Sequence, residues 1–217
     1  MLIAARESFA VASRRRLPYD AEVEYIEADN RTCTVQASTL LGVLNTGIVA
    51  NLATDVWECD AQFLAWGSTA GCWGRSGDRF AFGRGSASWA DWYYGYGNTN
   101  NRTGKTLDYS RHVFRLDAPA RKFYLGATVY TGAGTASPTS AALYIFARNP
   151  NVEGDTQWTT DNCHSRMYSS KIWRSGTLIQ HLIPVRVGNV GCAYDLVSGT
   201  LIRNHGLGTL AAGPDVN

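Results

Sequence analysis

The stretch DVWECDAQF, residues 55–63, decides the fold. Apolar or small side chains alternate with polar ones along it: Trp57, Cys59, Ala61 and Phe63 are separated by Glu58, Asp60 and Gln62. Successive side chains of a β-strand point to opposite faces of its sheet. This period of two therefore predicts a strand with one face buried.

Related patterns occur on both sides of that stretch. They predict further strands at residues 22–26, 79–83, 92–97, 111–116, 122–126, 142–147, 165–173, 176–185, 190–195 and 199–202. Within 165–173 this period puts Tyr168 and Ile172 on one face, and Gly176 after Ser175 supplies a hairpin turn to the next strand. Turn-forming residues fill the linkers at residues 98–104, 131–134 and 149–151. About ten short strands joined by turns predict an all-β fold, a sandwich of two antiparallel sheets.

The composition agrees with one β domain. The chain has 217 residues, of which 45% are hydrophobic, and this is enough for one sizeable core. Its 22 glycines and 12% aromatic residues suit short strands and tight turns better than helices. We expect one domain over residues 18–217, preceded by a short helix or loose arm at residues 1–17 that Pro18 ends.

Charge and hydropathy exclude two classes of partner. The formal net charge is only +2, and the one basic run, Arg14 to Arg16, is too short for a nucleic-acid arm. No stretch of about 18 apolar residues predicts a transmembrane helix. The N-terminus is mildly apolar, but Arg6 and Glu7 interrupt it, so it does not resemble a secretory signal.

The cysteines give no metal or redox motif. The five cysteines are widely spaced and include no C-x-x-C pair: Cys33, Cys59, Cys72, Cys163 and Cys192. We expect buried free thiols, because cysteine packs as a small apolar residue. A disulfide stays open at this point.

Several spaced motifs carry a resemblance to a known family. The C-terminal third contains R-x-Y-S-x-K-I-W (residues 166–173), G-x-L-I-x-x-x-I-P-V-R (176–186), D-L-V-S-G (195–199) and G-P-D-V (213–216). The same family pattern is also matched at residues 17–27, 45–48 and 147–149. Together these resemble the LamG-like, concanavalin A-like jelly-roll proteins of gut bacteria and their phages, over about residues 17–217. The stretch 27–36 departs from the family pattern, so the first strand pair is expected to differ.

This resemblance implies a lectin-like jelly roll with no defined activity, since the fold has many roles. We expect a non-catalytic module that binds a glycan or cell surface, displayed on a virion or bacterial surface. One alternative is a structural or assembly protein without a small ligand, a homo-oligomer or a partner of virion proteins. Another is a glycoside hydrolase or lyase on the same fold.

Aromatic residues are the predicted ligand contacts. Trp92, Tyr94 and Tyr96 share one face of a strand, where flat rings could stack on sugar faces and Asp91 and Asn98 could bind hydroxyl groups. The alternative is that these three rings fill the core. Four tryptophans fall in segments expected to be exposed loops and complete the predicted set: Trp66, Trp73, Trp89 and Trp158.

Other polar residues are weaker candidates. Glu22, Glu24 and Glu27 resemble a glycosidase pair only loosely, because Glu27 falls on the opposite strand face; we interpret them as structural or surface carboxylates. Cys163 and His164 are adjacent, and adjacent residues of a strand point to opposite faces, so this pair does not make a good two-ligand site. No cofactor is expected. Calcium stays open, with Asp60, Asp155 and Asp161 as its candidate ligands.

Overall fold

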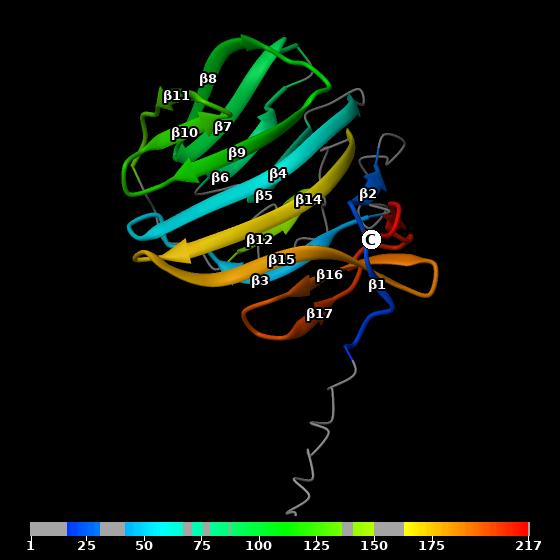
Figure 1. The fold of residues 1–217 in the computed structure, drawn as a ribbon. Helices are drawn as coiled ribbons and strands as arrows, with labels where there is room; N and C mark the ends of the chain where they lie inside the picture. The colour runs from blue at the N-terminus through cyan, green and yellow to red at the C-terminus, as the bar shows by residue number, and fades with distance from the viewer. Residues whose placement is uncertain are drawn as a thin grey trace, which may run out of the picture.

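The computed structural model describes residues 17–30, 42–66, 71–75, 79–86, 88–135, 141–149 and 163–216. Within these ranges the chain contains strands and no helix, and two sheets pack face to face as an open sandwich (Figure 1). The predicted fold class is confirmed. The predicted N-terminal arm, residues 1–17, lies outside the described residues except for Leu17.

The larger sheet forms the front of the molecule in Figure 1. Its main path runs β11-β10-β9-β4-β14-β15-β16-β17, with β1, β2 and β18 paired at its sides. The bounds are β1 Ala21–Glu22, β2 Ile26–Asp29, β4 Asp55–Trp66, β9 Arg111–Asp117, β10 Lys122–Leu125, β11 Thr128–Thr131, β14 Cys163–Arg174, β15 Thr177–Val187, β16 Val190–Asp195, β17 Thr200–Ile202 and β18 Ala211–Ala212.

The smaller sheet lies behind it, in the order β3-β12-β5-β6-β7-β8, with β13 paired to β5. The bounds are β3 Leu44–Val49, β5 Gly71–Arg75, β6 Arg79–Arg84, β7 Asp91–Gly97, β8 Thr99–Thr106, β12 Ala142–Ile145 and β13 Arg148–Asn149. Pairing is antiparallel throughout the described strands, except between β13 and β5.

Aromatic side chains from both sheets fill the space between them. Phe63 of β4 contacts the rings of Trp73, Trp92 and Phe114, with centroid distances of 5.3, 5.6 and 5.8 Å. Phe82 of β6 stacks on Phe114 of β9 at 4.7 Å. Because large side chains are joined to stiff strands, this core holds the sheets at a fixed separation.

The predicted alternation of β4 is confirmed: its burial pattern alternates along most of the strand, and Trp57, Cys59, Ala61 and Phe63 are all buried. The turn from β14 to β15 also forms as a hairpin, with positive φ angles at Ser175 (49°) and Gly176 (81°). Two consecutive positive angles define a type I′ turn, whose twist matches that of the strands it joins.

Three local predictions were wrong. Residues 98–104 were expected to be a linker, but most of them belong to β8, whose side chains alternate between half-buried and exposed beside β7. Backbone pairing at a sheet edge does not require apolar side chains, so the apolar pattern missed this strand. Residues 22–26 were expected to be one strand, but β1 pairs with β15 and β2 with β14.

The third error concerns β14. Tyr168 and Ile172 were predicted to share one face, but Ile172 is buried while Tyr168 is half-buried beside Arg111. The register between β14 and β4 shifts between Met167 and Ser169. One extra residue at such a bulge reverses the faces of all the residues that follow.

Candidate functional site

The outer face of the larger sheet carries polar and aromatic side chains in rows across the strands. The inward residues of β4, β9 and β14 build the core, so the residues between them point outward. Strand register places Arg111 opposite Gln62, Gln62 opposite Arg166, and Arg166 opposite Glu27. This row crosses β9, β4, β14 and β2, which lie side by side in Figure 1.

Four planar groups stack on one another here: the rings of Tyr25 and Tyr168 and the guanidinium groups of Arg111 and Arg166 from this row. We call them the Tyr25–Tyr168 cluster. The Arg166 guanidinium carbon lies 4.1 Å from the centroid of the Tyr25 ring. Tyr25 meets Tyr168 edge-on at 5.6 Å, and the guanidinium carbon of Arg111 lies 3.7 Å from the centroid of Tyr168. Cation–π contacts between arginine and tyrosine favour such stacks.

Ion pairs fix the two arginines of the cluster. Arg111 donates from Nε and Nη2 to the two carboxylate oxygens of Asp60, both at 2.8 Å, and Arg166 donates from Nε to Glu27 at 2.5 Å. The pKa of Arg111 is raised by its hydrogen bonds to Asp60. Both arginines therefore remain charged and held in one orientation.

Neutral hydrogen bonds fix the tyrosine end of the cluster. The Tyr168 hydroxyl donates to Oε1 of Gln62 at 3.0 Å, and Nε2 of Gln62 donates to the Tyr109 carbonyl at 2.9 Å. Because each group is already held, little side-chain entropy would be lost when a ligand is bound.

Glu27 is a structural carboxylate of this cluster. Besides Arg166, it contacts Nε2 of His164 at 2.5 Å. Burial opposes ionisation of Glu27, but the hydrogen bonds from Arg166 and His164 outweigh it and lower the pKa. Glu27 is therefore ionised at neutral pH, as the structural interpretation of this residue expects.

A second aromatic and guanidinium group lies on the same face. The guanidinium carbon of Arg115 lies 5.6 Å from the centroid of Trp173 and 5.8 Å from that of Tyr124. Glu58 lies 3.6 Å from Arg115 and 4.0 Å from Lys171. These residues continue the alternation of positive and negative charge across β9, β4 and β14.

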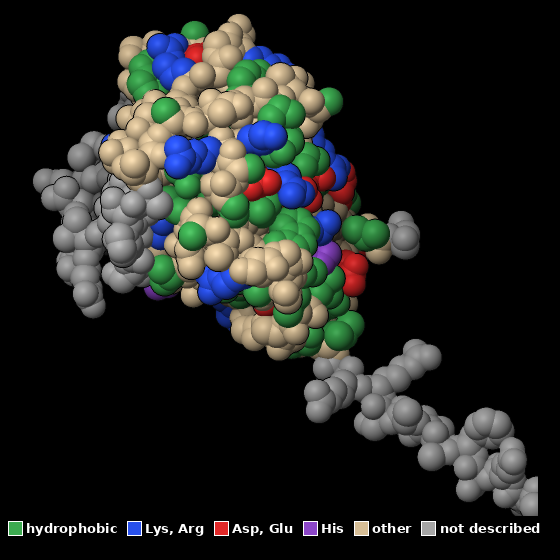
Figure 2. All heavy atoms as spheres, turned by 90° about the vertical axis from the view of Figure 1, so that its left-hand side faces the viewer, with side chains coloured by type: hydrophobic (Ala, Val, Ile, Leu, Met, Phe, Trp, Pro, Cys, Tyr) green, Lys and Arg blue, Asp and Glu red, His purple; other side chains and the backbone are tan. Residues whose placement is uncertain are grey.

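Charge is dispersed on one end of the molecule and on the outer face of the larger sheet. Figure 2 shows the end at the left of Figure 1, where Lys and Arg side chains are scattered singly or in small groups among apolar and neutral ones. On the outer face of the larger sheet, acidic side chains lie next to Arg111, Arg115 and Arg166. This pattern favours a neutral ligand over a polyanion, whose binding needs concentrated positive charge.

The predicted aromatic face of β7 lies in the core. Trp92, Tyr94 and Tyr96 are 0%, 3% and 8% exposed and pack against the larger sheet, as the alternative interpretation of these rings expected. Trp73 was predicted to be exposed, and this is wrong: it is 0% exposed within β5. None of these four rings presents a face to solvent.

The remaining predicted contacts are spread over the molecule. Trp66 is half-buried at the end of β4 and stacks on Phe63 at 4.8 Å. Asn98 is exposed beyond β7, but its side-chain oxygen accepts hydrogen bonds from Thr99 and Thr135, so it stabilises a loop. Trp158 lies outside the described residues.

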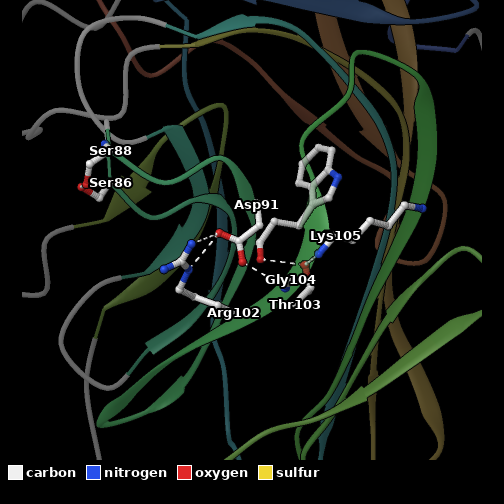
Figure 3. A network of polar contacts seen from close by, with 8 residues as sticks. Ser86, Ser88, Asp91, Arg102, Thr103, Gly104 and Lys105 are labelled. Atoms are coloured by element: carbon white, nitrogen blue, oxygen red, sulfur yellow. Dashed lines mark hydrogen bonds and ion pairs between the residues drawn. The ribbon is translucent and has the colours of Figure 1, made fainter.

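Two predicted contacts, Trp89 and Asp91, are brought together by Arg102 of β8. Figure 3 shows the carboxylate of Asp91 pointing toward Arg102, which contacts it through Nε at 2.8 Å and through Nη2. The backbone N–H of Gly104 donates to the other oxygen at 3.0 Å. The Arg102 guanidinium carbon lies 5.0 Å from the centroid of the half-buried Trp89 ring.

These bonds make Asp91 a structural residue. Burial opposes its ionisation, but the hydrogen bonds from Arg102 and Gly104 prevail and lower the pKa. Its side chain is only 9% exposed, and both of its oxygens are already engaged. The Trp89–Arg102 contact is thus a smaller aromatic and cationic group than the Tyr25–Tyr168 cluster.

Sequence reasoning missed the Tyr25–Tyr168 cluster. Its members are far apart in the chain. The bulge in β14 also made the predicted face of Tyr168 wrong. One signal was present: residues 111–116 alternate basic and apolar side chains, which puts Arg111 and Arg115 on one outward face.

The described residues contain no group of three or more potential metal ligands. Asp60, a predicted calcium ligand, is paired with Arg111, while Asp155 and Asp161 lie outside the described ranges. Cys59 and Cys192 are buried free thiols, as predicted, and Cys163 is also buried. No helix in the described part of the chain is long and apolar enough to span a membrane.

Comparison with known proteins adds no relative. No family model, curated protein or solved structure matches this chain.

Proposed function

We propose that this protein is a non-catalytic module that binds a neutral glycan or a glycan-bearing cell surface through the outer face of its larger sheet. The observation that carries the proposal is the Tyr25–Tyr168 cluster, in which ion pairs hold two rings and two guanidinium groups in place. Sugars combine apolar ring faces with hydroxyl groups. Aromatic surfaces flanked by fixed polar groups match both features.

The sequence motifs support the same proposal. They resemble LamG-like, concanavalin A-like jelly-roll proteins, and a sandwich of two antiparallel sheets is compatible with that architecture. Display on a phage or bacterial surface belongs to this proposal.

The carboxylates favour binding over glycoside hydrolysis or lyase chemistry. A glycosidase needs a general acid whose pKa is raised, together with a second carboxylate nearby. Glu27 has a lowered pKa and is engaged by Arg166 and His164, while Glu22 and Glu24 are exposed.

A glycan array followed by isothermal titration calorimetry tests the proposal. We expect Tyr168→Ala and Tyr25→Ala each to weaken binding of the selected glycan by about five- to thirty-fold, the range typical of a central interface residue. Tyr19→Ala is the matched control, because Tyr19 and Tyr194 form another ring pair, at 5.0 Å, near β16. Equal losses in all three variants, or no glycan bound by the wild type, would refute the proposal.

One observation favours the assembly alternative: tyrosine, tryptophan and arginine are also the residues enriched in protein interfaces. Under this alternative the outer face contacts a second copy or a virion protein. Light scattering as a function of concentration separates the two functions. A dimer lost in Tyr168→Ala, without any glycan binding, would favour assembly.

A further inference from the structure

A cavity lies at an open edge of the sandwich, away from the outer face of the larger sheet. It has a volume of about 310 Å³ and lies where β3 of the smaller sheet faces β15 and the β16–β17 hairpin of the larger one. Small-molecule sites begin at about 300 Å³. The cavity is therefore large enough for a small ligand.

The lining of the cavity combines apolar walls with hydrogen-bond acceptors. Three isoleucines supply apolar surface: Ile48 from β3, Ile179 from β15 and Ile202 from β17. The polar lining includes Gln180 and Asp195, which are 4% and 3% exposed. Burial at this level makes the hydrogen bonding of these two side chains decisive.

Gln180 contributes an acceptor without a donor. Its Nε2 donates to the carbonyl of Thr46 at 2.9 Å, and this fixes which end of the amide carries oxygen. The other end, Oε1, is shielded from solvent and has no hydrogen-bond partner in the described structure. A buried acceptor without a donor is costly, so a small shift of the side chain that turns Oε1 toward the cavity would be favoured when a ligand there supplies an N–H group.

Asp195 contributes a carboxylate without a cation. Its Oδ1 accepts hydrogen bonds from the backbone N–H groups of His181 and Val197 at 2.9 and 3.1 Å, and its Oδ2 accepts one from the Ser198 hydroxyl at 2.6 Å. All three donors are neutral. No Lys, Arg or His is among the described residues that line the cavity.

The nearest histidine does not supply the missing charge. The pKa of the His181 side chain is lowered by its burial and by Lys171, which outweigh the opposing effect of Asp195. His181 is therefore neutral at pH 7, and the negative charge of Asp195 stays uncompensated beside the cavity.

We propose that this cavity binds a primary ammonium group carried on a short aliphatic chain. The ammonium group has three N–H donors and a positive charge, which match Oε1 of Gln180 and the carboxylate of Asp195. Its methylene groups would cover the three isoleucines. This inference goes beyond glycan binding, since it concerns another surface and a charged ligand.

Calorimetry or NMR titration with n-butylammonium tests the proposal, and n-butanol is the neutral analogue of the same length. We expect the wild type to bind butylammonium about tenfold or more tightly than butanol, because charge-assisted hydrogen bonds are the stronger ones. Asp195→Asn keeps the size of the side chain and should abolish this preference. Equal affinity for the two probes in the wild type, or no saturable binding, would overturn the proposal.

Two further variants guard against misfolding and against confusion with the outer face. Thr200→Trp places a large side chain at the exposed rim of the cavity, leaves Asp195 intact and should also abolish butylammonium binding. Tyr168→Ala should leave butylammonium binding unchanged, so the two proposals can fail separately. Persistent binding in Thr200→Trp would place the ammonium elsewhere.

A last titration separates the two sources of such a group. N-acetyl-lysine methylamide carries the same alkylammonium on a peptide unit. Tighter binding of this compound than of butylammonium would indicate the lysine side chain of a partner protein. Equal or weaker binding would indicate a free small amine.

Discussion

Two aspartates of β4, each paired with an arginine of a neighbouring strand, allow the effect of burial on an ion pair to be measured in one molecule. The carboxylate of Asp55 accepts hydrogen bonds from Nε and Nη2 of Arg174 at 2.9 and 2.8 Å. The carboxylate of Asp60 accepts hydrogen bonds from Nε and Nη2 of Arg111, both at 2.8 Å. The pairs differ in burial: the side chain of Asp55 is 0% exposed and that of Asp60 is 22% exposed. Asp→Asn at each position removes the charge and preserves the shape.

The two substitutions should have very different costs. Asp55 also accepts hydrogen bonds from the Asn51 backbone N–H at 2.9 Å and the Thr54 hydroxyl at 2.8 Å. An asparagine amide must therefore place an N–H₂ group against at least one donor of Arg174. Charged hydrogen bonds contribute about 1.5–3 kcal/mol each, so Asp55→Asn should lower the free energy of unfolding by about 2–4 kcal/mol. Asp60→Asn should cost about 0–1 kcal/mol, as exposed pairs do.

Thermal and urea unfolding at pH 7 measure both effects. A change of 1 kcal/mol shifts the melting temperature of a domain of this size by about 2–4 °C, so Asp55→Asn should melt about 4–16 °C below the wild type. Asp60→Asn should stay within about 4 °C of it. Equal shifts for the two variants would refute the argument that burial, and not ion-pair geometry, sets the contribution.

The pH dependence of the Asp55 contribution has a definite sign. Burial opposes ionisation of Asp55, but Arg174 and the hydrogen bonds from Asn51 and Thr54 prevail and lower its pKa in the folded state. A lowered folded pKa gives a contribution that is complete above the unfolded value of about 3.9 and declines as the pH falls below it. The stability gap between wild type and Asp55→Asn should therefore narrow below about pH 4. A gap that widened there would contradict the assigned direction.

Three further predictions concern single residues. Gly95→Ala would place a Cβ 2.3 Å from the buried Tyr93 hydroxyl and should cost about 1–3 kcal/mol in urea unfolding, whereas a neutral result would mean that the ring moves freely. Ser175→Asn gives the Asn-Gly pair that a type I′ turn prefers and should raise stability by about 0.5 kcal/mol; a loss would argue against this turn type. Burial raises the pKa of the Cys59 thiol, so iodoacetamide at pH 8 should label it only after unfolding, and rapid labelling of the native protein would show access to the core.

Much of the fold could be predicted from the sequence because most strands carry local patterns. Two examples are the alternation of residues 55–63 and the Ser-Gly turn at residues 175–176, each of which depends only on residues close to it in the sequence. The bulge between Met167 and Ser169 is different, because it depends on how β14 pairs with β4. No local pattern marks this bulge, and the face of Tyr168 was therefore predicted wrongly.

The candidate site was harder to predict because alternation assigns residues to faces without saying which face is inward. Trp92, Tyr94 and Tyr96 were correctly placed on one face of β7, yet every residue of that strand is buried, so both of its faces are covered. On β9 and β14 the outward face carries Arg111, Arg166 and Tyr168 instead. The positions of aromatic residues alone could not distinguish a strand that is covered on both faces from a strand with one face outward.

The larger sheet separates the side chains that build the core from those that face outward. Each of β4, β9 and β14 gives alternate side chains to the core and to the outer face, and exposed ion pairs on the outer face contribute little to stability. Tyr168→Ala should therefore shift the melting temperature far less than Phe114→Ala, which removes a ring from the centre of the core. Since the outer-face side chains are not part of the core between the sheets, they could change from one ligand to another without loss of the fold. Comparable destabilisation by the two variants would mean that the outer face is part of the stabilising structure, and the argument that it serves recognition would lose its basis.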